Sequence, residues 1–445
     1  MDSQALAIMT SSTTRKRKGS LIAATAMSID IATEPGNSGK RRQRRTASAD
    51  VLKRPASATG SDVGAVQKTF IFHPVVDDNS PIDCQITGRC LKVGSDFAGI
   101  SMESLAMKSL NITHSREFHC EKIEYCRKIL DKNHTPAVMQ EDVMTRDPKR
   151  TPKVDVFFCT FPCQPFSRAG RQAGVNDAAG RGVCVIGSLE YIKEHKPKVV
   201  IMENVDAILN KKYIGLLELI RAHLEEHGYT FWESVAKLTD FKIPHNRSRW
   251  HLVAIRRTSQ QREFQWPLPL KGSPTLLDLT LDQIIRPLPA AQWEAMPAGG
   301  SATCLTALDK AYKKAVADGI NPFSNHIIVD VGASKGFSNA MVGVCPTLTR
   351  SRCSQFGYWS TIKGGRLDTN EMALLMGFRR SEVFTDGCCS EHQFAGCIGN
   401  GCSVTYLSML IPEALYAAKL ITHMQLNVLR QRAEINRLSL GITLG

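Results

Sequence analysis

The sequence predicts an α/β protein built on an open, mostly parallel, doubly wound sheet. From about residue 90 onward, apolar runs of strand length alternate with segments of helical spacing, a pattern typical of βαβ units. Two runs, VDVFFCT (154–160) and KVVIMEN (198–204), are mainly apolar, as expected for strands buried on both faces. Cysteine and polar residues stand where these runs end. Ligands of such sheets bind at the carboxyl ends of the strands, so these residues are the first candidates for a site.

The elements follow one another in a regular order. The expected strands lie at 90–97, 117–121, 154–160, 198–204 and 248–257. The expected helices lie at 100–110, in a stretch ending near 133, and at 183–195, 214–228, 369–376 and 404–420. The helix at 214–228 is amphipathic and closes on a glycine, and Asp368 with Glu371 predicts a capping box at the start of the helix near 369.

Changes of composition divide the chain into five parts. Strand-like texture begins near residue 68, and a segment rich in Pro and Gly begins near 258. We expect a disordered basic tail, the first part of a catalytic domain, a small irregular target-recognition region, the C-terminal part of the catalytic domain and a C-terminal tail. Their predicted ranges are 1–67, 68–257, 258–340, 341–425 and 426–445.

Charge is concentrated at the N-terminus. Residues 1–60 carry 11 Lys and Arg against four Asp and Glu, which is half of the formal net charge of +14. The segment has no aromatic residue and cannot bury enough apolar surface to offset the entropy of ordering it. Its basic runs at 15–18 and 40–45 suit importin or nucleic acid phosphates, and we expect a nuclear protein. A solvated basic tail without a specific partner is the alternative.

Several classes of protein are disfavoured. No apolar run reaches the roughly 18–20 residues that cross a bilayer, and no apolar segment follows the early basic residues as in a secretory signal. We therefore expect no membrane partner. The 14 cysteines are scattered without paired C-x-x-C knuckles, so we expect reduced thiols and no metal site.

The loop TFPCQPFS (160–167) carries the candidate nucleophile. It follows a buried strand, and Pro162 and Pro165 restrict the backbone on both sides of Cys163. A cysteine held at a ligand-binding edge suits covalent catalysis, although an inert buried thiol is the common fate of cysteine. Cys159, inside the strand, fits that second description.

Two further segments place charged groups at the same edge. Glu203 ends the strand at 198–204 and suits a general acid beside a nucleophilic thiol, or a helix cap or turn residue. Arg247 and Arg249 stand two apart at the start of a strand, so alternation places both on one face. Paired guanidiniums suit phosphate or carbonyl recognition, or form a surface charge pair.

The first strand–helix turn, GSDFAGIS (94–101), allows close approach of a ligand to Gly99. Glu121 ends the second expected strand, where doubly wound folds carry an acidic residue that binds ribose hydroxyls. Asp142 follows a third short segment. Together these residues indicate a cofactor that contains a nucleoside.

The order of these pieces resembles the C5-cytosine methyltransferase family. FPCQPFSRAG (161–170) is similar to its catalytic loop, MENV (202–205) to its glutamate motif and RSR (247–249) to its paired-arginine motif. FAG (97–99) with the two acidic residues above resembles its cofactor site. RLDTNEMALLMGF (366–378) and IGNG (398–401) resemble its two C-terminal motifs. The resemblance covers roughly residues 90–420.

The resemblance implies an S-adenosylmethionine-dependent methyltransferase fold and a DNA (cytosine-5-)-methyltransferase. Cys163 would add to C6 of a flipped-out cytosine, Glu203 would hydrogen-bond N3, Arg249 would reach the base and a phosphate, and Arg247 would orient the loop or Glu203. The implied S-adenosyl-L-methionine site consists of Phe97, Ala98, Gly99, Glu121, Asp142, Pro162 and Asn400. Ser167 and Arg168 would contact the nucleic acid backbone.

The chain departs from the family pattern at several positions, among them Asp368, which holds the place of a threonine. Ser95 stands where an acidic residue is often found, Ser101 replaces a second glycine, His245 replaces a glutamine, and Gly401 replaces a serine. Two other functions remain open: a tRNA cytosine-5 methyltransferase, and a catalytically silent member that only binds nucleic acid. Against the first, the 258–340 region lacks a Cys-Phe-Thr tripeptide; against the second, both Cys163 and Glu203 are present.

Overall fold

The structure is a computed structural model that describes residues 90–168, 170, 172–270, 281–285, 302–333 and 338–440. The basic tail predicted at 1–67 and the strand-like run that follows it lie outside the described residues. All elements below belong to the compact unit that begins at Asn79.

A seven-stranded sheet forms the centre of this unit, with strand order β3-β2-β1-β4-β5-β7-β6. Neighbouring strands from β3 to β5 pair in parallel, whereas β7 is antiparallel to both of its neighbours. This confirms the predicted mostly parallel sheet. The strands are β1 (Leu91–Asp96), β2 (His114–Cys120), β3 (Val138–Gln140), β4 (Val156–Cys159), β5 (Val199–Val205), β6 (Tyr229–Lys237) and β7 (Ser248–Arg256).

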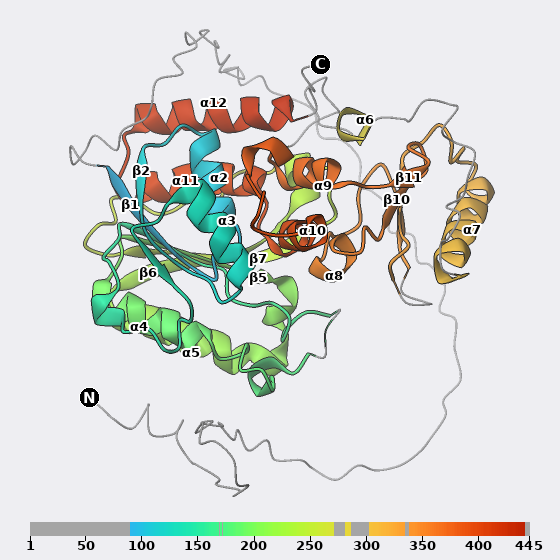
Figure 1. Ribbon diagram of the computed structural model, residues 1–445. Helices are drawn as coiled ribbons and strands as arrows, with labels where there is room; N and C mark the ends of the chain where they lie inside the picture. The colour runs from blue at the N-terminus through green and yellow to red at the C-terminus, as the bar shows by residue number, and fades with distance from the viewer. Residues whose placement is uncertain are drawn as a thin grey trace, which may run out of the picture. The chain divides into compact units, whose positions relative to one another are not determined.

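Helices cover both faces of the sheet (Figure 1), as the term doubly wound requires. One face carries α2 (Met102–Ser109), α3 (Glu124–His134), α11 (Val404–Ala417) and α12 (His423–Ser439). The other carries α4 (Val185–His195) and α5 (Ile214–Glu226). Alternate residues of the central strands enter the two cores: Phe158 faces the first and Phe157 the second. The continuous apolar run of β4 is explained by burial on both sides.

A smaller sheet with the order β11-β10-β8-β9 has its own hydrophobic core under α7. Its elements are α7 (Ala302–Ala317), β8 (Ile327–Asp330), β9 (Ala340–Val342), β10 (Tyr358–Ser360) and β11 (Gly365–Arg366). The short helix α6 (Leu281–Ile284) precedes these elements in the sequence, and α8 (Arg350–Cys353) lies between β9 and β10. Strands from both sides of residue 340 share this sheet, so its end does not coincide with the predicted boundary.

The C-terminal part returns to the large sheet. It contains α9 (Thr369–Met376) and α10 (Glu391–Asn400), followed by α11 and α12. Asp368 accepts a hydrogen bond from the amide of Glu371, whose carboxylate accepts from the amide of Asp368. The predicted capping box is therefore present.

Other expectations also differ from the structure. The tail predicted from residue 426 is largely the helix α12, whose Leu426, Leu429 and Ala433 are buried against the rest of the unit. The elements that were not predicted include α7, α10, β6 and the strands of the small sheet. The edge strand β6 is mostly half-buried, so its side chains lack the apolar run that identifies the central strands.

Within the described residues, no single helix is both long and apolar enough to cross a membrane. The pair α10 and α11 meets the requirement only when taken together, across a 44° bend.

The packing of α12 predicts a contrast between two of its residues. Leu429 is fully buried and Ile435 is 60% exposed. Leu429→Ala should lower the free energy of unfolding by about 2–5 kcal/mol, because it leaves a cavity, whereas Ile435→Ala should change it by about 0.5 kcal/mol or less. Urea denaturation measures both values. Equal, small effects would mean that α12 does not belong to the folded unit.

Candidate active site

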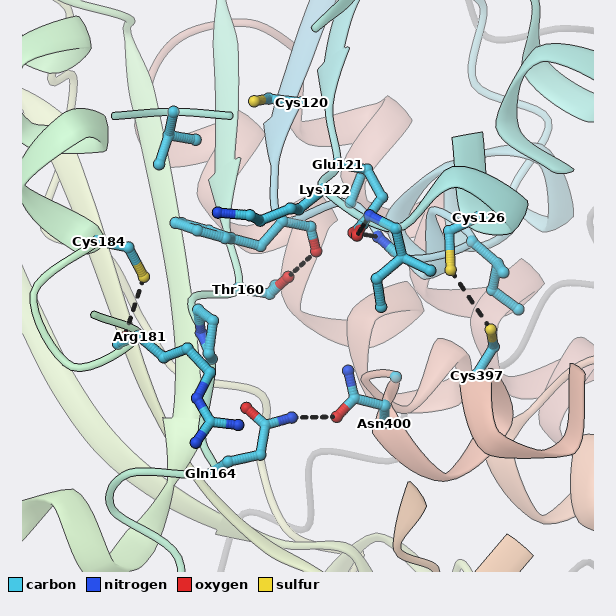
Figure 2. Close-up of a pocket in the computed structure, with 18 of the residues that line it drawn as sticks. Cys120, Glu121, Lys122, Cys126, Thr160, Gln164, Arg181, Cys184, Cys397 and Asn400 are labelled. Atoms are coloured by element: carbon cyan, nitrogen blue, oxygen red, sulfur yellow. Dashed lines mark hydrogen bonds between the residues drawn. The ribbon is translucent and has the colours of Figure 1, made fainter. Parts of the chain in front are cut away.

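A cavity of about 490 Å³ lies at the carboxyl ends of β1 to β4 (Figure 2). The turns that follow these four strands supply Phe97, Glu121, Asp142 and Pro162 to its wall, and the end of α10 supplies Asn400. The structure thus brings together residues that are up to 303 positions apart in the sequence. All seven residues predicted for cofactor binding line this cavity: Phe97, Ala98, Gly99, Glu121, Asp142, Pro162 and Asn400.

The turn after β1 requires an unusual backbone. Phe97, Gly99 and Ser101 all have positive φ angles, of 57°, 57° and 61°. A Cβ atom at Gly99 would meet no atom within 4 Å, so this stretch of backbone lies open for close approach. The preceding Asp96 is fully buried and forms hydrogen bonds of 2.5 and 2.6 Å with both terminal nitrogens of Arg146. Asp96 therefore anchors the end of β1 and does not line the cavity.

The two acidic residues of the cavity differ in their surroundings. Glu121 accepts hydrogen bonds of 2.8 Å from the backbone amides of Gly99 and Ile123, and burial raises its pKa. Burial also acts to raise the pKa of Asp142, but hydrogen bonds from Lys122 and the amide of Met144 outweigh it and leave that pKa lowered. Each carboxylate is thus held in one orientation by groups from two turns: Glu121 from those after β1 and β2, and Asp142 from those after β2 and β3.

The loop after β4 carries Cys163 and is held from two directions. The side-chain amide of Asn204, on β5, donates a 3.0 Å hydrogen bond to the carbonyl of Phe161. From the other side, Gln164 donates to the side-chain oxygen of Asn400 at 3.3 Å, and Figure 2 shows this bond between two residues of the cavity wall. Gln164 was quoted in the predicted motif without a role, and its contact could not be foreseen because Asn400 lies 236 residues away.

Charged groups surround the Cys163 thiol. Burial raises the pKa of this thiol. The charge of Arg249 lowers the pKa, the charge of Glu203 raises it and the charge of Arg247 lowers it. The net effect is a raised pKa. The four residues predicted to carry the chemistry therefore form one cluster. It lies next to the cavity, since Pro162 and Gln164 on either side of Cys163 line the wall.

The two arginines have different partners. Nε of Arg249 lies 3.1 Å from Oε1 of Glu203, and both side chains are largely buried. Arg247 is 2% exposed and donates to the backbone carbonyls of Leu348, Gly399 and Gly401. We expected Arg247 to orient the loop or Glu203. The structure gives the ion pair with Glu203 to Arg249, and Arg247 instead secures the segment that ends in Asn400.

The residues predicted to touch nucleic acid lie just beyond Cys163. The amide of Ser167 donates to the carbonyl of Cys163 at 2.9 Å, which closes the turn of the loop. Arg168 is 73% exposed and lies 3.5 Å from Asp206, which directly follows β5. Arg168 is thus at the surface beside the Cys163 cluster.

Further residues of the cavity wall were not predicted. Arg181 and Cys184 reach it from the segment before α4, and Cys126 on α3 and Cys397 on α10 place their sulfur atoms 3.6 Å apart (Figure 2). A lone arginine or cysteine in a loop or helix carries no spacing signal, so sequence patterns could not select them. Glu103, in the first turn of α2, also lines the wall.

Two of the departures from the family pattern have local explanations. His245 is fully buried, its Nε2 accepts a 3.0 Å hydrogen bond from the amide of Leu348, and burial lowers its pKa, so the ring is neutral. At Gly401, an added Cβ would lie 2.4 Å from Cε and 2.9 Å from Cγ of Met102. Met102 is buried, so this side chain occupies the space that a serine would need.

Comparisons with known proteins agree with this arrangement. The family model described as C-5 cytosine-specific DNA methylase matches residues 91–414. The type II methyltransferase M.HhaI of Haemophilus parahaemolyticus is 30% identical over 201 residues, which cover 45% of this chain and 59% of the relative. M.Eco47II of Escherichia coli is 31% identical over 218 residues, which cover 48% of this chain and 50% of the relative. The chain thus spans only about half to three fifths of the length of these relatives.

The solved structure of the Entamoeba histolytica methyltransferase EhMeth resembles the fold with a TM-score of 0.51 and 18% sequence identity. The match covers 74% of this chain and 98% of that one. At this identity the likeness concerns the fold, and it agrees with the predicted methyltransferase architecture.

The environment of Cys163 predicts how its reactivity depends on pH. Because its pKa is raised above the ordinary value of 9.0, the thiolate fraction should grow about tenfold per pH unit up to pH 9. The rate of iodoacetamide alkylation at Cys163, followed by mass spectrometry of that peptide, should grow with it. Arg249→Met should slow alkylation at each pH, because Arg249 lowers the thiol pKa. A rate that levels off below pH 8 would contradict the burial of this thiol.

The contact between Met102 and Gly401 predicts coupled mutations. Gly401→Ser should destabilise the protein by about 1–3 kcal/mol through overpacking, and Met102→Ala should remove that penalty when both changes are present. A double-mutant cycle from urea denaturation should give a coupling of about 0.5–3 kcal/mol. Strictly additive effects would mean that the two side chains do not compete for one space.

Proposed function

Because the chain belongs to the C-5 cytosine-specific DNA methylase family, we propose that it is a DNA (cytosine-5-)-methyltransferase that uses S-adenosyl-L-methionine. The observation that carries the proposal is the cluster of Cys163, Glu203 and Arg249 beside a cavity of about 490 Å³. The family description supports DNA as the substrate.

The cavity fits the methyl donor by its chemistry. The carboxylate of Glu121 is oriented by two backbone amides and retains lone pairs that suit a pair of ribose hydroxyls. Phe97 offers an aromatic ring, Ala98 and Gly99 an open backbone, and Pro162 a wall next to Cys163. We propose that Asp142 binds the adenine amino group and that Asn400 closes the cavity through its bond to Gln164. When bound, S-adenosylmethionine supplies an electrophilic methyl group.

The residues of the cluster supply the covalent chemistry. The thiolate of Cys163 adds to C6 of cytosine, and Glu203 carries the proton that it shares with N3, where electron density accumulates. This addition makes C5 nucleophilic, so that C5 accepts the methyl group. Loss of the C5 proton then expels the Cys163 thiolate and restores the aromatic ring. Arg249 holds the carboxylate of Glu203 in place through the 3.1 Å ion pair and contributes positive charge beside the base.

The target base must leave its helix to reach this cluster, because C5 and C6 are not accessible to a buried thiol within a stacked duplex. We propose that Arg168, exposed next to the cluster, and Ser167 contact the backbone on either side of the flipped nucleotide. The small sheet with α7 is the proposed target-recognition domain. A nuclear location stays a prediction from the basic runs in residues 1–67.

The first test measures methyl transfer. Tritiated S-adenosylmethionine should label DNA but not tRNA when both are offered side by side. Cys163→Ala should lower transfer to background, because it removes the thiol that adds to C6, while its melting temperature stays close to that of the wild type. Cys90→Ser, which changes an exposed thiol outside the cavity, is the matched control and should transfer normally.

Each alternative has its own result in the same experiment. Labelling of tRNA alone would assign an RNA substrate. Binding of S-adenosylmethionine without transfer to either nucleic acid would indicate the silent member. An adduct with DNA containing 5-fluorocytosine tests the covalent step itself, since fluorine at C5 cannot leave as a proton does. A trapped adduct on any residue other than Cys163 would contradict the mechanism.

A further inference from the structure

The cavity is lined by a buried carboxylate that forms no ion pair with any of the described residues. Glu103 is 4% exposed, and its Oε1 accepts a 2.8 Å hydrogen bond from the hydroxyl of Ser101. Among the described residues, no lysine, arginine or histidine forms an ion pair with it. The charge of Arg116 acts on this carboxylate without an ion pair, and the Nε of Arg116 donates to the hydroxyl of Ser104. A buried carboxylate is costly unless it is paired with a cation. A positively charged group of a ligand in the cavity could provide that ion-pair partner.

Packing places Glu103 at one end of the cavity. Met102, the residue before it, lies against Gly401, and the neighbouring Asn400 accepts a hydrogen bond from Gln164 next to Cys163. The thiol of Cys402, which also lines the wall, is fully buried, and its pKa is raised by burial and by the charges of both Glu203 and Glu103. Glu103 therefore lies at the end that adjoins the Cys163 cluster. The nucleoside residues Glu121 and Asp142 follow β2 and β3, at the other end. A ligand whose nucleoside lies at β2 and β3 would bring its remaining part towards Glu103.

We propose that the carboxylate of Glu103 binds the α-ammonium group of the amino-acid portion of S-adenosylmethionine. This inference rests on the proposed function, because it assumes that the cavity holds this donor. The ammonium group would supply the missing cation, and its position would fix the sulfonium end of the donor near Pro162 and Cys163.

Two departures from the family pattern surround Glu103. The hydroxyl of Ser101 donates to its carboxylate, and Ser95, fully buried at the end of β1, also acts on it. Burial raises the pKa of Glu103, and both serines act against that rise. A carboxylate at position 95 would stand next to that of Glu103, and two buried carboxylates repel each other. In this chain the acidic side chain at this place therefore comes from position 103 on the helix, whereas the family pattern has it at position 95 on the strand.

The test compares two probes by isothermal titration calorimetry. S-Adenosylhomocysteine carries the ammonium group, and methylthioadenosine lacks the whole amino-acid portion. Glu103→Gln should weaken binding of S-adenosylhomocysteine about tenfold or more and leave that of methylthioadenosine unchanged, because only the first loses a charge-assisted bond. Glu124→Gln, an exposed glutamate on α3 outside the cavity wall, is the matched control and should alter neither affinity.

A second variant distinguishes binding from a structural role. Adding Ser95→Asp to Glu103→Gln returns a carboxylate to the same space and should restore most of the affinity for S-adenosylhomocysteine. A loss that is equal for both probes, or that the second change does not reverse, would overturn the inference and leave the proposed function intact. A wild-type chain that binds neither probe would overturn the proposed function instead.

The wild-type chain provides a test that does not depend on folding of the variants. The analogue of S-adenosylhomocysteine that lacks only its amino group should bind about tenfold or more weakly than the parent compound. Equal affinity of the wild type for the two compounds would overturn the inference.

Discussion

The buried ion pair between Glu203 and Arg249 is the interaction on which the rest of the site depends. The two residues come from adjacent antiparallel strands, β5 and β7, so the ion pair forms only after these two strands have paired. Burial makes each charge costly alone, and removing one partner would leave the other uncompensated in the interior. The pair therefore fixes a carboxylate beside the Cys163 thiol at the edge where β4 ends, and it couples the chemistry of the cluster to the register of the sheet.

The C-terminal segment completes the cavity through contacts to the backbone rather than through packing alone. Arg247 is one residue before β7, yet its guanidinium donates to carbonyls at 348, 399 and 401. Gln164 then reaches Asn400 from the Cys163 loop. The cavity thus closes between the first part of the large domain and its last helices, with the small sheet inserted between them in the chain. This arrangement explains why the seven candidate cofactor-binding residues line one cavity although they extend over 304 positions of the sequence, from 97 to 400.

Much of the fold could be predicted from the sequence because its signals are local. The apolar runs of β4 and β5, the helix that begins at the capping box of Asp368, and the residues that follow strand ends all lie where the pattern placed them. The elements that were missed carry weaker local signals. The strand β6 lies at the edge of the sheet, and α12 has a polar composition with only a narrow buried stripe of Leu426, Leu429 and Ala433. The partners of Arg247 could not be predicted, because they are backbone carbonyls about 100 to 154 residues away.

The departures from the family pattern make sense as spatial pairs rather than as single changes. Gly401 stands where the family pattern has a serine. The side chain of Met102, 299 positions earlier in the sequence, occupies the space that the serine side chain would need. Ser95 looks like a lost acid until the carboxylate of Glu103 is found beside it, with Ser101 as a hydrogen-bond donor. In both cases a second side chain stands beside the position that departs from the pattern: Met102 against Gly401, and Glu103 beside Ser95. A substitution in a buried site is constrained by what its neighbours already fill, so such a site can change its residues while it keeps its ligand.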